Sequence, residues 1–127
     1  MSNESDSNQS DLPAILSALL RFLSWLLLVS LFGQFFIAGM SSMTNPDWWA
    51  YHKGWVGVFQ WLVLPLPVLA WFSGRPRLAR TAFASLPIAQ MTLQYVFVDR
   101  ALEGRMPFGV GFHALNAALM ILIAAAL

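Results

Sequence analysis

The sequence of 127 residues contains no cysteine, so disulfide bonds and thiolate metal sites are excluded. It also has little charge: only 10% of its residues are Asp, Glu, Lys or Arg, against about 25% in a typical soluble domain. The net charge of +1 is too small to attract nucleic acid, so no nucleic-acid partner is expected. Because 58% of the residues are hydrophobic, the composition predicts a protein whose surface faces the lipid bilayer.

Long apolar segments follow from this composition, and a helix needs roughly 20 mainly apolar residues to cross a bilayer. Four segments meet that length: about residues 13–40, 49–72, 78–98 and 108–127. None of them alternates apolar and polar residues as the strand of a membrane β-barrel does. The sequence therefore predicts an all-α fold, an integral membrane four-helix up-down bundle over residues 13–127.

Residues 1–12 are polar, and we expect them to form a disordered N-terminal tail. The start of the chain is acidic rather than basic, and the apolar stretch that follows is longer than that of a signal peptide. We therefore expect no cleaved signal peptide. The tail ends in Ser10-Asp11-Leu12-Pro13, a pattern typical of a helix start.

Positive charge indicates the orientation, because Lys and Arg in short loops stay on the cytoplasmic side. Residues 73–80 carry three arginines and no acid, whereas acids offset the bases in residues 99–105. We therefore expect a multi-pass protein of the cell inner (plasma) membrane with both termini cytoplasmic. Tryptophans and a tyrosine within residues 48–55 suit the membrane–water interface on the outer side.

Polar side chains within the predicted spans are the most informative residues, because each is costly in lipid and marks packing or function. At 1.5 Å rise per residue, one group of them falls within roughly 10 Å in depth, in the outer half of the bundle. This polar layer draws on all four predicted spans and consists of Gln34, His52, Gln94, His113 and Asn116. The inner half has no comparable layer, so we expect the function to reside in the polar layer.

His52 and His113 lie on the second and fourth predicted spans, which are diagonal in a sequential bundle. With neighbouring helices about 8–10 Å apart, the diagonal is roughly 14 Å, too wide for one zinc ion but suited to two imidazoles that ligate a haem iron. We therefore hypothesise a membrane haem b-binding protein for electron transfer or haem handling, with both histidines as metal ligands. Gln34, Gln94 and Asn116 would orient the imidazoles.

Residues near the histidines fit a bound macrocycle. Ala114 and Ala117 would leave space for its edge. Aromatic residues on nearby turns would surround the ring, namely Trp55, Phe59, Phe97 and Phe112.

Each of these features also has a purely structural explanation. Gln and Asn side chains often join membrane helices, with hydrogen bonds worth about 0.6 kcal/mol each. The alternative is therefore a cofactor-free structural or accessory subunit that packs in a homo-oligomer or a larger membrane complex. A third hypothesis is a bundle that binds lipid or quinone near Gln60 and Gln90. No phosphate-binding loop or intramembrane carboxylate is present, so no catalytic residue is assigned and an enzyme is not favoured.

Four short motifs follow one another along the chain: Gly33-Gln34-Phe35-Phe36, His52-Lys53-Gly54-Trp55, Gln90-Met91-Thr92-Leu93-Gln94 and His113-Ala114-Leu115-Asn116. Over about residues 19–127, their order resembles a family of small, largely uncharacterised four-span prokaryotic membrane proteins. The layout is also similar to one four-helix half of haem A synthase, in which histidines at the outer ends of the second and fourth helices ligate haem b. That resemblance implies the same role for His52 and His113.

Overall fold

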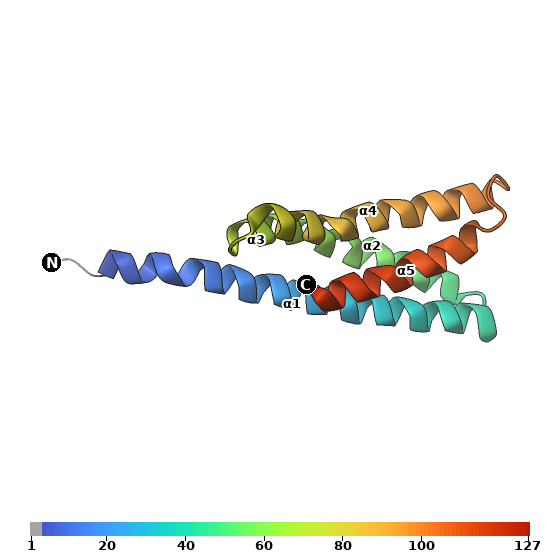
Figure 1. Ribbon diagram of the computed structural model, residues 1–127. Helices are drawn as coiled ribbons and strands as arrows, with labels where there is room; N and C mark the ends of the chain where they lie inside the picture. Colours follow the sequence, from blue (N-terminus) through green and yellow to red (C-terminus); the bar gives the residue numbers. More distant parts are fainter. Residues whose placement is uncertain (1–3) are drawn as a thin grey trace.

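The computed structural model describes the backbone of residues 4–127, with side chains from Asp11 onward, and every element in this part is a helix. The elements are α1 (Glu4–Met43), α2 (Trp48–Phe59), the 3-10 helix η1 (Gln60–Val63), α3 (Pro65–Phe72), α4 (Arg77–Leu102) and α5 (Gly109–Ala126). The predicted all-α fold is confirmed for these residues. Figure 1 shows that the chain reverses direction at each connection, with α2, η1 and α3 following one another along a single path.

Helix α1 begins earlier than the sequence predicts. Residues 4–12, which we expected in a disordered tail, belong to this helix, and Pro13 lies inside it. Residues 1–3 of the predicted tail lie outside the described residues. In Figure 1 the N-terminal part of α1 extends beyond the C-terminal end of α5.

Three stretches of the described chain are long and apolar enough to cross a membrane: Asp11–Met43, Trp48–Phe72 and Gly109–Ala126. This finding is consistent with a membrane protein. The third predicted span, about residues 78–98, forms α4 but is not among the three. Its arginine, serine, threonine and glutamine side chains lower its mean hydropathy below that of the other spans.

Apolar side chains occupy both faces of α1. The inward row follows helical spacing and is buried, and consists of Leu20, Leu27, Leu28 and Leu31. The outward row is equally apolar but exposed, and consists of Phe22, Trp25, Val29, Phe32 and Phe36. A helix that is apolar on both faces is typical of a segment that packs on one side and faces lipid on the other.

The path from Trp48 to Phe72 is interrupted where two prolines occur. Pro65 and Pro67 have no backbone N–H to donate, so the α-helical hydrogen bonding cannot pass through them unbroken. The chain tightens into η1, with Leu64 N donating to the carbonyl of Trp61 at 3.3 Å, and α3 then begins at Pro65. This break separates α2 from the tightly packed core around α3.

The core of the bundle contains several alanines that let helices approach closely. Leu27, Leu66 and Met120 are fully buried there, and so are Ala70 and Ala84. Helix α1 packs against α2, α3 and α5, while α4 packs against α3 and α5. Within the described residues, the path from α2 through α3 makes no backbone contact with α5, and α1 makes none with α4, so these pairs lie on the diagonals of the bundle, as the sequence predicts.

Candidate functional site

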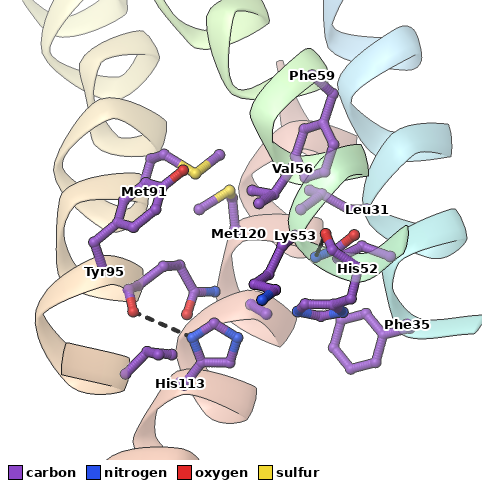
Figure 2. Close-up of a pocket in the computed structure, with 14 residues that line it drawn as sticks. Leu31, Phe35, His52, Lys53, Val56, Phe59, Met91, Tyr95, His113 and Met120 are labelled. Carbon is purple, nitrogen blue, oxygen red and sulfur yellow. Dashed lines mark hydrogen bonds between the residues drawn. The ribbon is translucent and has the colours of Figure 1, made fainter. Parts of the chain in front are cut away.

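A cavity of about 130 Å³ lies between α1, α2, α4 and α5, towards the end of the bundle that carries connections 44–47 and 103–108. Its polar lining residues are Gln34, His52, Lys53, Gln94, Tyr95 and His113. The rest of its lining is apolar and consists of Leu31, Phe35, Val56, Phe59, Met91, Val98, Ala117 and Met120. The cavity therefore holds the two histidines at one end of a mainly apolar space (Figure 2).

The two imidazole rings face each other across this cavity (Figure 2), with centroids 6.4 Å apart and ring planes inclined by 49°. Nδ1 of His113 lies 3.2 Å from the main-chain carbonyl oxygen of Gln94. Because a carbonyl oxygen can only accept, Nδ1 must carry the hydrogen. In the neutral ring, Nε2 of His113 is then an acceptor.

The side chain of Gln34 joins α1 to α2. Its Nε2 donates to the main-chain carbonyl of His52 at 3.1 Å. This bond fixes the orientation of the Gln34 amide, because the amide oxygen, which is an acceptor, could not bond to the carbonyl oxygen of His52. The Oε1 atom of Gln34 is buried and has no hydrogen-bond partner.

Further buried polar atoms around the cavity lack partners. Besides Gln34 Oε1, they are Nδ1 of His52 and Oε1 of Gln94, and both residues line the cavity. Gln94 is only 8% exposed, so its amide is taken out of the surrounding solvent or lipid. Buried polar groups in folded proteins nearly always have partners, so unpaired atoms gathered on one cavity indicate a site that a ligand or water completes.

Asn116 belongs to the predicted polar layer but does not line the cavity. It is buried, and its Nδ2 donates to the main-chain carbonyl of Gln90 at 2.7 Å. Gln60, proposed from the sequence as part of a lipid or quinone site, also lies outside the cavity lining and accepts a hydrogen bond of 2.7 Å from the Tyr95 hydroxyl. These two side chains join helices rather than face the cavity.

The hypothesis of a haem b protein with His52 and His113 as ligands is wrong. Among the side chains that the structure describes, no three of His, Cys, Asp or Glu come together in a way that could hold a metal ion. The cavity of about 130 Å³ is close in size to one of about 150 Å³ that holds a benzene ring, and below the range of roughly 300–1,000 Å³ typical of larger ligands. A porphyrin does not fit these residues, and the proposed electron-transfer role falls with it. Neither the described residues nor any similarity supports the alternative of an accessory subunit.

The aromatic residues expected to surround a macrocycle have other contacts. Trp55 donates from Nε1 to the main-chain carbonyl of Ser30 at 2.9 Å, while Phe97 and Phe112 stack on each other with centroids 5.8 Å apart. Of the four, only Phe59 lines the cavity.

Sequence reasoning missed several lining residues, above all Met91 and Met120. Both lie among the side chains at the cavity (Figure 2). An apolar residue in an apolar span carries no signal in the sequence, so only the helix rotation seen in the structure reveals them.

Residues 34–102 match a family of unknown function, DUF6220. The matched segment contains Gln34, His52 and Gln94 from the cavity and ends before His113. No curated protein and no solved structure matches the chain, so the resemblance to haem A synthase finds no support in these comparisons.

Proposed function

We propose that this chain, which belongs to the DUF6220 family of unknown function, is a four-span membrane protein. It binds a small amphiphile that carries a ring in the cavity between His52 and His113. The observation that carries the proposal is the cavity itself, which is close to the size of one ring and receives both apolar and polar side chains. Ligand sites are typically apolar spaces with a few convergent polar groups.

The proposal counts α4 as a membrane span too, which makes four spans in an up-down bundle. The two glutamines in the middle of this helix, Gln90 and Gln94, are each only 8% exposed and therefore point into the bundle. Polar residues within membrane spans usually face the bundle interior in this way. Pro87 is buried as well, and α4 packs between α3 and α5, so its outer face is left to apolar residues such as Leu86 and Leu93.

The distribution of charge supports termini on the cytoplasmic side of the plasma membrane. At connection 103–108, Glu103 forms ion pairs with Arg105 at 3.2 Å and with Arg100 at 3.5 Å, which offsets the positive charge there. At the opposite end, Arg80 donates to the Ser73 hydroxyl at 2.9 Å, and no carboxylate from residue 11 onward forms an ion pair with it. Because uncompensated Lys and Arg stay cytoplasmic, the cavity lies in the outer half of the membrane.

A membrane position also accounts for the apolar lining of the cavity. A ligand that reaches this site from the bilayer must dissolve in lipid, so it carries an apolar tail. Its ring is held by residues such as Phe59, Met91 and Met120, while its polar group meets Gln34, Gln94 and the histidines. Several of these polar atoms are buried without protein partners, so a ligand that forms hydrogen bonds with them offsets the cost of their burial.

Binding is tested with 4-octylphenol and 4-octylanisole, which share a ring and a tail, on the purified protein in detergent micelles. We expect at least one of them to bind saturably, as seen by native mass spectrometry and by a rise in Tm. A ligand at 100 times its Kd stabilises a folded protein by about 2.7 kcal/mol.

Two variants locate the binding. Ala117 lines the cavity, so Ala117→Phe fills it and should abolish the rise in Tm. Ala114 lies one turn earlier on α5, is exposed and does not line the cavity, so Ala114→Phe should leave binding unchanged. Failure of both probes to bind, or equal loss of binding in the two variants, would contradict the proposed function.

A further inference from the structure

Several acceptor atoms at the cavity have no donor, although Lys53 and the ring of His52 also line it. Gln34 uses its amide nitrogen on the carbonyl of His52 and leaves Oε1 unpaired. His113 uses Nδ1 on the carbonyl of Gln94, which leaves the lone pair of Nε2. Gln94 adds a third acceptor through its unpaired Oε1. A ligand with only carbonyl or ether oxygens would leave these acceptors unpaired.

Tyr95, which also lines the cavity, supplies no donor for these acceptors. The hydroxyl of Tyr95 donates its only hydrogen to Oε1 of Gln60 at 2.7 Å. The hydroxyl oxygen of Tyr95 can therefore only accept a further hydrogen bond.

The charge around the cavity disfavours a ligand whose donor is a cationic group. Among the side chains that the structure describes, from Asp11 onward, no Asp or Glu lines it, and Lys53 is its one charged lining residue. An ammonium group would meet a like charge without a carboxylate to compensate it, in a region of low dielectric. A neutral hydroxyl group donates a hydrogen bond without that penalty.

We propose that the headgroup bound in this cavity is a neutral aromatic hydroxyl, that is, a phenol or quinol carried on a lipid-soluble tail. The single hydrogen of its hydroxyl is donated to the unpaired Oε1 of Gln94, one of these three acceptors, and its ring lies among the apolar lining residues. This inference rests on the proposed function and adds the ligand's hydrogen-bonding character to it. Reduced, hydroxyl-bearing rings therefore bind in preference to oxidised rings whose oxygens are carbonyls.

The test compares the affinities of two probes for the full chain in lipid nanodiscs. 4-Octylanisole differs from 4-octylphenol only in a methyl group that replaces the donated hydrogen. We expect the phenol to bind at least tenfold more tightly than the anisole. A third probe, 4-octylbenzylamine, is cationic and should bind no more tightly than the anisole.

Variants assign the preference to a residue. Gln94→Leu removes one cavity acceptor and should reduce the preference for the phenol to less than threefold, while the anisole still binds. Retained anisole binding shows that the variant is folded. Gln90→Leu makes the same substitution one turn away, at a buried glutamine outside the cavity lining, and should keep the tenfold preference.

The outcomes separate this inference from the proposed function. Equal binding of phenol and anisole would leave the proposed function standing and overturn the inference. Tighter binding of the amine than of the phenol would overturn it too. If neither neutral probe binds, as expected of a cavity that holds only water, both the inference and the proposed function fail.

Discussion

The imidazole of His113 donates from Nδ1 to the main-chain carbonyl of Gln94 at 3.2 Å and thereby ties α5 to α4 beside the cavity. The helix that carries His52 has no backbone contact with α5, so its ring meets that of His113 only through side chains that extend across the diagonal. The bond to Gln94 therefore decides which ring nitrogen of His113 is free to act on a ligand.

This contact makes a prediction about the tautomer of His113. We expect the neutral ring to be protonated at Nδ1, because the carbonyl of Gln94 accepts that hydrogen. Solid-state ¹⁵N NMR of the protein in bilayers distinguishes the two nitrogens, and His113→Gln assigns the signals, since only one other histidine is present. A ring protonated at Nε2 would contradict both the contact and the acceptor role of that nitrogen.

Asn116 provides a second prediction, on stability. Its amide donates to the main-chain carbonyl of Gln90 at 2.7 Å between two helices, and its side chain is buried. We expect Asn116→Leu to lower the free energy of unfolding by about 0.6 kcal/mol, and by no more than about 1.7 kcal/mol, the range measured for such bonds in membranes.

Thr92→Val is the matched control for that measurement. The hydroxyl of Thr92 donates to Ile88 within its own helix at 3.0 Å and is exposed, so its removal should change stability by less than Asn116→Leu does. Steric trapping or denaturant titration in bilayers gives both values. An Asn116→Leu protein as stable as the wild type would mean that this bond does not join the helices.

The polar layer shows how far the sequence leads. Depth along each helix follows from the residue number alone, so the prediction that Gln34, His52, Gln94 and His113 lie near one another is correct. Rotation about the helix axis does not follow from a sequence that is apolar on every side. For that reason the sequence also predicts Asn116 at the site, one turn beyond His113, whereas its side chain points to Gln90 instead.

Other errors have related causes. The haem hypothesis relied on the separation of two helix axes, which says nothing about the volume between them, and the side chains of residues such as Met91 and Met120 reduce that volume to about 130 Å³. The glutamines that lower the mean hydropathy of α4 are buried against other helices. Mean hydropathy counts every residue of a helix alike, so it does not distinguish these buried glutamines from exposed ones.

Gly109 allows a third prediction, because α5 begins closely packed against the end of α4. A Cβ atom at this position would lie 2.5 Å from the main-chain oxygen of Phe97 and 2.8 Å from Cβ of Ala101. Backbone cannot yield as a flexible side chain does, so we expect Gly109→Ala to lower the free energy of unfolding by about 1–3 kcal/mol.

Gly111 lies two residues further along α5, and a Cβ atom there would meet nothing within 4 Å apart from its chain neighbours and its own helix backbone. Gly111→Ala should therefore be neutral, or stabilise the helix by up to about 1 kcal/mol. Thermal unfolding of the two variants under the same conditions checks the difference. If both behave alike, α4 and α5 do not approach each other as closely as the structure shows.

The absence of cysteine makes the orientation directly measurable, because any introduced cysteine is the only thiol in the chain. Thr44 and Ala79 are both exposed, near opposite ends of the path from Trp48 to Phe72, and neither carries a charge whose loss would alter topology. In intact cells, a membrane-impermeant maleimide should label Thr44→Cys, and it should label Ala79→Cys only after lysis. The reverse pattern would invert the proposed orientation and place the cavity in the cytoplasmic half of the membrane. Labelling of both from the same side would show that the path interrupted at Pro65 does not cross the bilayer at all.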